Sequence, residues 1–143
     1  MDLVVSNQKL SDDFYLMTVS KHFDPEREPL PRMGQFFMVR AWEDYPLLSR
    51  PLSIYDSVTR GHQTEASFLY SIVGKGTEIF GALKSGDSIS IGRALGNAFP
   101  LLNGKVALVG GGAGIAPLHL AALSLKKTAL LSIHTSGSET NLS

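Results

Sequence analysis

The chain has 143 residues, of which 43% are hydrophobic and 18% charged, the balance of a globular protein rather than a disordered one. Its 13 Lys and Arg residues are matched by 13 Asp and Glu residues, which argues against nucleic acid or an anionic membrane as a partner. The sequence contains no Cys, so we expect no disulfide, thiolate nucleophile or Cys-ligated iron–sulfur cluster in this chain. We expect a cytoplasmic protein, because there is no signal-peptide pattern and no apolar run of roughly 18 residues.

The N-terminal two thirds of the sequence consist of short apolar segments separated by turn signals rich in Gly and Pro. This pattern is typical of an antiparallel barrel or sandwich. One short amphipathic helix is predicted at residues 77–84, with Thr77 as its N-cap. Six strands are expected, at residues 3–6, 14–20, 35–41, 52–56, 66–73 and 88–91.

A different pattern begins after residue 103. Residues 105–109 form the compact apolar run of a buried parallel strand, a Gly-rich turn follows, residues 116–125 suit an apolar helix, and residues 129–133 suit a second strand. This order predicts the start of a Rossmann-like domain. The expected fold class is therefore β + α/β, with a six-stranded antiparallel barrel in residues 1–103 and a fragment of a nucleotide-binding domain in residues 104–143.

Two parallel strands covered by one helix cannot bury their apolar surfaces by themselves. Three explanations are open: the polypeptide is truncated, another chain completes the domain, or the C-terminal residues pack back on the barrel. An exposed apolar strand favours association, so a homo-oligomer or heteromer is expected.

Three short motifs suit the binding of a phosphorylated cofactor. The first is Arg50-Pro51-Leu52-Ser53, where a guanidinium fork matches phosphate and a nearby hydroxyl can reach a ring nitrogen. The alternative is a solvated Arg beside a turn Ser.

The other two motifs are rich in glycine and precede helices. In Gly74-Lys75-Gly76-Thr77, and in Gly110-Gly111-Gly112-Ala113-Gly114, backbone amides could approach an anion at a helix N-terminus. The second motif departs from the standard G-x-G-x-x-G spacing. A Gly-rich turn into a helix, with no ligand, is the alternative for each.

A fourth segment, Leu95-Gly96-Asn97-Ala98-Phe99, suggests by itself only a turn-rich loop with a buried Phe. The four segments in this order resemble the ferredoxin-reductase superfamily, and most closely the electron-transfer subunits of heterodimeric dihydroorotate dehydrogenases. The resemblance extends from about residue 3 to residue 133. It implies an antiparallel FAD-binding barrel followed by an NAD-binding domain.

The resemblance also implies roles for individual residues. Arg50 would hold the FAD pyrophosphate and Ser53 the edge of the isoalloxazine, with Leu52 where many members place a stacking Tyr. Gly76 and Thr77 would offer amides and a hydroxyl to the pyrophosphate. The remaining cofactor-binding residues would be Pro51 and Leu69-Tyr70-Ser71 for FAD, and Gly110, Gly111, Gly112 and Gly114 for NAD(H).

Three departures from the family pattern stand out. Arg93-Ala94 replaces the usual Gly-Pro before Leu95, most of the nucleotide domain is missing, and so is the Cys cluster that holds a [2Fe–2S] centre. We therefore expect no iron–sulfur cluster in this chain and impaired NAD(H) oxidation.

The resemblance predicts an FAD-binding subunit that moves electrons between NAD(H) and a partner oxidoreductase, and it implies that this partner is a dihydroorotate dehydrogenase catalytic subunit. The alternatives are a sulfide or ferredoxin–NAD(P) reductase-type subunit, and a remnant that keeps the barrel without binding flavin. No side-chain acid or base is required for hydride transfer to flavin, so no catalytic residue is assigned. The histidines at 22, 62, 119 and 134 show no metal-ligand spacing, and the acidic residues of segment 24–28 suit a solvated turn.

Overall fold

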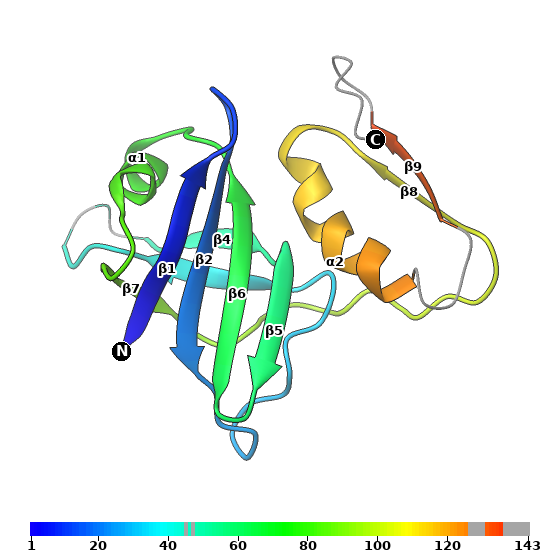
Figure 1. The fold of residues 1–143 in the computed structure, drawn as a ribbon, viewed down its shortest axis with the longest axis horizontal. Helices are drawn as coiled ribbons and strands as arrows, with labels where there is room; N and C mark the ends of the chain where they lie inside the picture. Colours follow the sequence, from blue (N-terminus) through cyan, green and yellow to red (C-terminus); the bar gives the residue numbers. More distant parts are fainter. Residues whose placement is uncertain (45, 47, 126–130, 136–143) are drawn as a thin grey trace.

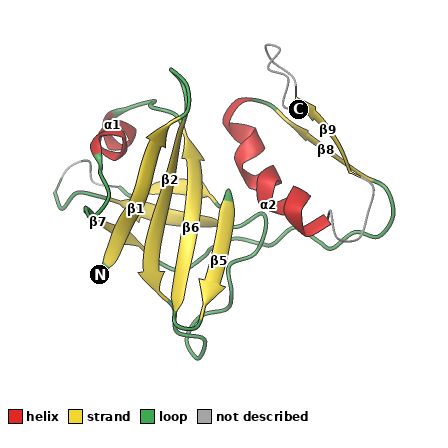
Figure 2. Cartoon of the chain, in the orientation of Figure 1, coloured by secondary structure: helices red, strands yellow, loops and turns green. Residues whose placement is uncertain are grey.

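The computed structural model describes residues 1–44, 46, 48–125 and, for the backbone, 131–135. Its larger part is a twisted antiparallel sheet with α1 (Lys75–Ala82) at one end, and its smaller part is an α/β unit beside the barrel (Figures 1 and 2). The strands of the barrel are β1 (Asp2–Lys9), β2 (Tyr15–His22), β3 (Phe36–Arg40), β4 (Arg50–Ser53), β5 (Asp56–Arg60), β6 (Gln63–Tyr70) and β7 (Ser88–Ile91).

The barrel has seven strands, so the prediction of six was wrong. Their order is β4-β3-β7-β1-β2-β6-β5. The single strand expected at residues 52–56 is instead the end of β4, which pairs with β3, a bend at Ile54 and Tyr55, and the start of β5, which pairs with β6. At the bend, Ile54 N donates to Gln35 O at 3.0 Å and Tyr55 N donates to Ser67 O at 2.9 Å. These bonds extend both pairings up to the bend, so one continuous segment links the two outer strands of the sheet.

Alternating side chains from the strands fill the barrel interior. On β2 and β6 every second residue is buried, as the period of two requires. Phe37 and Phe68 meet edge to face with ring centroids 5.8 Å apart, and Phe80 seals the end of the core from α1. The buried cluster comprises Val4, Met17, Val19, Phe37, Val39, Leu52, Ile54, Ala66, Phe68, Tyr70, Phe80, Ile89 and Ile91.

The smaller unit has the predicted β–turn–α–β order. Strand β8 (Val106–Gly110) leads through a 3₁₀ turn, η1 (Gly112–Ile115), into α2 (Ala116–Leu125), and pairs in parallel with β9 (Leu131–Thr135). The expected helix bounds are confirmed, whereas the second strand begins at Leu131, and residues 129–130 of the expected strand lie outside the described residues. The division at residues 103 and 104 stays a prediction.

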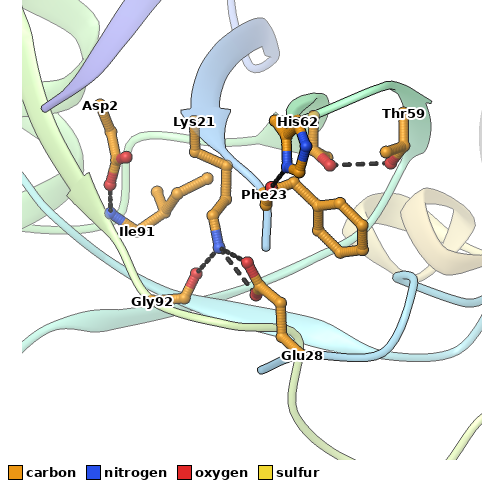
Figure 3. Close-up of polar contacts among 9 residues, drawn as sticks. Asp2, Lys21, Phe23, Glu28, Thr59, His62, Ile91 and Gly92 are labelled. Carbon is orange, nitrogen blue, oxygen red and sulfur yellow. Dashed lines mark hydrogen bonds and ion pairs between the residues drawn. The ribbon is translucent and has the colours of Figure 1, made fainter. Parts of the chain in front are cut away.

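The end of the barrel away from α1 is held together by a buried ion pair (Figure 3). Lys21 Nζ lies 3.0 and 2.9 Å from the carboxylate oxygens of Glu28 and donates to Gly92 O at 2.9 Å. The exposed fractions are 9% for the Lys21 side chain and 14% for that of Glu28. Glu28 is thus no solvated turn residue: it ties the loop after β2 to the barrel.

Neither of the two α-helices in the described part of the chain is long and apolar enough to cross a membrane.

Candidate functional site

A cleft of about 310 Å³ opens where β4, β6, α1 and the start of α2 converge. Figure 1 shows α1 and the first turn of α2 at the same end of the barrel. The volume is at the low end of the roughly 300–1,000 Å³ typical of small-molecule sites. Eight of the thirteen predicted site residues line it: Arg50, Pro51, Leu52, Ser53, Leu69, Tyr70, Ser71 and Thr77, together with Val73, Ala113 and Ala116.

Arg50 is the one charged side chain among the residues named as lining this cleft. Its guanidinium carbon lies 5.9 Å from the Trp42 ring centroid, and its Nη1 donates to Leu48 O at 3.0 Å. Gly76 lies directly behind, because a Cβ added there would come within 2.8 Å of Arg50 Nε and 2.9 Å of Trp42 Cη2. A larger residue at 76 would therefore displace the cation. The sequence analysis assigned no role to Trp42.

The start of α1 forms a second wall of the cleft. The helix cap is Gly74, and Thr77 is the third helical residue, so the prediction of Thr77 as N-cap was wrong. Its hydroxyl accepts from Val73 N at 2.8 Å and Gly74 N at 3.1 Å and donates to Gly74 O. The hydroxyl is thereby committed to shaping the turn. The first N–H groups of the helix have no carbonyl acceptor within the helix, and they carry the positive end of its dipole.

Tyr70 also lines the cleft, and it is 3% exposed. Its ring stacks on Tyr15 at 5.5 Å and meets Phe80 edge to face at 5.9 Å. Its hydroxyl donates to Asn7 Oδ1 at 2.9 Å. Burial raises the pKa of Tyr70 to about 12, so the hydroxyl is neutral at physiological pH.

The glycine loop approaches the cleft through Ala113 and not through its predicted glycines. Gly110 lies under the following turn, where a Cβ would come within 2.7 Å of Leu118 Cδ1. Gly112 has a φ of +54°, a left-handed conformation that favours glycine. Of the predicted nucleotide-binding residues, Gly110, Gly111, Gly112 and Gly114, none is among the residues named as lining the cleft. The loop is shaped for close backbone packing, and it brings the α/β unit to the barrel site.

Helix α2 docks on the barrel through His119. Its ring stacks on Tyr55 with centroids 3.9 Å apart and planes at 8°, and its Nδ1 lies 3.0 Å from Tyr55 O. Because a carbonyl can only accept, Nδ1 carries the proton. The loop before β8 adds Phe99, packed on Gly34, where an added Cβ would come within 2.6 Å of the ring. Phe99 is 38% exposed, so the expectation of a buried Phe was wrong.

A second hollow, about 470 Å³, lies at the opposite end of the barrel. Lys21, His22, Arg60, His62 and Gln63 contribute to its lining. Lys21 is already neutralised by Glu28. The Arg50 cleft is the stronger candidate, because it joins a cation, helix amides and an apolar wall in one place.

A ligand with a flat apolar part and a phosphate would match these groups. The Tyr70 and Leu52 side offers an apolar surface, and Arg50 with the amide end of α1 offers complementary charge and donors. The cradle behind Arg50 exists only because residue 76 lacks a Cβ. The observed residues therefore fit a phosphorylated ring cofactor.

A scan against models of protein families gives no match. Among curated proteins, the chain is 45% identical over 128 residues to the dihydroorotate dehydrogenase B (NAD(+)) electron transfer subunit of Clostridium acetobutylicum, covering 88% of this chain and 48% of that protein. It is 32% identical over 139 residues to the subunit of the same name from Bacillus pumilus, covering 94% and 52%. The chain spans about half the length of the curated relatives it matches.

Solved structures show the same fold. The NADH-dependent reduced ferredoxin–NADP oxidoreductase studied for flavin-based electron bifurcation has a TM-score of 0.79 at 29% identity, covering 94% of this chain and 48% of the other. A ferredoxin–NADP⁺ reductase from Neisseria gonorrhoeae, solved with FAD and NADP bound, has a TM-score of 0.72 at 18% identity, covering 96% and 57%.

An antiparallel barrel followed by a parallel β–α–β unit, with a cleft between them, defines the ferredoxin-reductase-type architecture. The predicted fold class is therefore confirmed, apart from the number of strands. Within that class, the chain is a homologue of the dihydroorotate dehydrogenase B electron transfer subunits.

Proposed function

We propose that this chain binds FAD in the Arg50 cleft and transfers electrons between a pyridine nucleotide and a partner oxidoreductase. The observation that carries this proposal is the convergence of Arg50, the first turn of α1 and Tyr70 on one cleft that also touches the glycine-loop unit. The similarity to electron transfer subunits supports it.

Each group in the cleft has a distinct part in this proposal. Arg50 and the amides of Gly76 and Thr77 hold the pyrophosphate, while Leu52 and Tyr70 border the ring and Ser53 lies at its edge. The remaining cofactor-binding residues are Pro51, Leu69 and Ser71. When bound, FAD supplies the hydride and single-electron chemistry, and the protein orients it and excludes water from one face.

In this proposal the α/β unit binds NAD(H). Ala113 and Ala116 reach the cleft directly, so a nucleotide held by the loop of Gly110, Gly111, Gly112 and Gly114 would lie next to the ring site. The barrel of residues 1–103 and the unit of residues 104–143 then meet at the place of electron transfer. The glycine loop would contact the nucleotide through backbone groups, since its residues carry little side chain.

The proposed partner is the catalytic subunit of a dihydroorotate dehydrogenase, as the names of the relatives suggest. The second candidate is that this chain is a sulfide or ferredoxin–NAD(P) reductase-type subunit, favoured by its structural likeness to the NADH-dependent reduced ferredoxin–NADP oxidoreductase. Co-purification with a dihydroorotate-oxidising subunit would favour the first candidate, and binding of ferredoxin the second.

The visible absorbance of the purified protein, measured before and after FAD is added and the sample desalted, tests the flavin proposal. Bands of bound flavin are expected in the wild-type protein and in R60A, which removes an exposed Arg at the far end of the barrel. R50A should weaken FAD binding by at least roughly tenfold, because it removes a charge-assisted contact to phosphate. A colourless wild-type protein that takes up no FAD would refute the proposal and favour a non-catalytic remnant.

A further inference from the structure

A β-bulge in β1 turns one polar side chain inward. Val4 pairs with Val19, but Ser6 pairs with Thr18, so Val5 is an extra residue in the register. As a result Asn7 lies opposite the buried Met17, and Val4 and Asn7 face inward with a spacing of three. An undisturbed strand with Val4 inward would point residue 7 to the outer face.

The inward amide of Asn7 makes three hydrogen bonds. Its Nδ2 donates to Phe80 O at 2.7 Å and to Leu83 O at 3.0 Å, the carbonyls that end α1. Its Oδ1 accepts from the Tyr70 hydroxyl at 2.9 Å. Since both backbone partners can only accept, the amide can satisfy them in one orientation, and that orientation aims Oδ1 at Tyr70.

Asn7 therefore joins two walls of the cleft, although it is not one of the lining residues given above. Its donors fix the C-terminal end of α1, a rigid helix of eight residues and about 12 Å, whose other end offers amides to the cleft. Its acceptor fixes the Tyr70 hydroxyl. Its cross-strand neighbour in the sheet is the buried, apolar Met17.

We propose that Asn7 is a positioning residue for the cofactor, which sets the distance between the phosphate-binding end of α1 and the ring-binding wall at Tyr70. This inference rests on the proposed function. It assigns the role to a strand outside all four sequence motifs and more than 60 residues from both walls that it joins.

Two substitutions test separately the connection from Asn7 to α1 and the connection from Asn7 to Tyr70. N7D places a carboxylate without donors against the carbonyls of Phe80 and Leu83, but keeps the acceptor for Tyr70. Y70F removes the hydroxyl and leaves the bonds from Asn7 to α1 intact. T18V is the matched control, because it removes one hydrogen bond of 2.9 Å, to Ser67, from the outer face of the same sheet.

The affinities of the three variants for FAD and for riboflavin, which lacks phosphate, are measured by flavin fluorescence. N7D should weaken FAD by roughly tenfold and riboflavin by less than about twofold, since its effect passes through the phosphate end of α1. Y70F should weaken both ligands by similar factors, and T18V should match the wild-type protein. If N7D does not fold, N7A takes its place and is compared with Y70F, because N7A removes both connections; its loss beyond that of Y70F should then fall on FAD and not on riboflavin.

Loss of FAD and riboflavin affinity to the same extent in the Asn7 variant would overturn the inference, because general loosening would then explain it. Unchanged FAD affinity in that variant, with normal binding by the wild-type protein, would overturn the inference and leave the proposed function intact. A wild-type protein that binds no FAD would refute the proposed function, and the inference would fall with it.

Discussion

The barrel and the α/β unit differ sharply in how they bury their apolar residues. The barrel encloses thirteen buried side chains contributed by six of its strands, the bend after β4 and α1. In the described part of the α/β unit only Ala116, Ala121 and Leu125 are buried, and Val109 on β8 is 71% exposed. The stable framework of the candidate site thus lies in the barrel, while the α/β unit depends on docking against it.

Substitution of one side chain in each region tests this contrast most directly. Phe68 is fully buried against Phe37, so F68A should lower the free energy of unfolding by about 3–5 kcal/mol. V109T replaces an exposed side chain on β8 with one of similar shape, and it should shift the free energy of unfolding by less than about 0.5 kcal/mol. Urea unfolding followed by circular dichroism measures both, and comparable losses would contradict the contrast.

The buried ion pair at the far end of the barrel should give the next largest effect. E28A leaves the Lys21 ammonium without its counter-charge at 9% exposure and should cost about 3 kcal/mol of unfolding free energy. The double variant K21M/E28L, which removes both charges, should recover most of that loss. A double variant as unstable as E28A would contradict a charge-based explanation. D12A, which breaks the exposed Lys9–Asp12 pair, should leave thermal unfolding unchanged.

Local patterns predicted elements that lie between strong turn signals better than elements whose ends are set by distant hydrogen bonds. The helix bounds of α2 and the strand at residues 88–91 were right because apolar runs, glycines and a proline punctuate them along the chain. The bend between β4 and β5 was missed, since its hydrogen bonds reach Gln35 and Ser67, which no local pattern reveals.

The candidate site shows the same limit of prediction from local sequence patterns. Motif order placed eight predicted residues in one cleft, but Trp42 behind Arg50 and Asn7 behind Tyr70 carry no motif. Asn7 faces inward only because of a bulge, and a strict alternation of two would have placed it outside. Glu28 looked solvated because its partner, Lys21, lies on the preceding strand, where an inward Lys is unexpected.

Alkaline unfolding probes Tyr70, which belongs to the barrel side of the candidate site. Burial raises the pKa of Tyr70 from 10.0 to about 12, so the protonated phenol contributes stability that is fully present below pH 10 and is lost as the pH rises to 12. The loss attributable to this group is about 2–3 kcal/mol. Y70F should lack it, whereas Tyr55, whose pKa burial and Asp56 also raise, stays in both proteins. Urea unfolding from pH 8 to pH 11.5 measures the difference, and equal slopes would contradict it.

Substitution of Gly76 tests whether the barrel side governs cofactor affinity. G76A places a Cβ within 2.9 Å of both Arg50 Nε and Trp42 Cη2, so Arg50 must shift and FAD binding should weaken by roughly tenfold. G74A is the matched control, because an added Cβ there meets no atom within 4 Å. Titration of the apoprotein with FAD measures both, and equal affinities in the two variants would show that the Gly76 cradle has no part in binding.

The junction between the two regions should give the smallest effect. H119A removes both the stacking on Tyr55 and the bond to its carbonyl, a loss of about 1 kcal/mol in the docking of α2. Amide hydrogen exchange should become several-fold faster in α2 and stay unchanged in β2 and β6, because only the docked unit opens. H119F, which keeps an aromatic ring, should show an intermediate rate, and L123A, at a position 44% exposed, should match the wild-type protein. Faster exchange throughout the barrel would mean that the two regions unfold together, and the contrast between an independent barrel and a dependent unit would be lost.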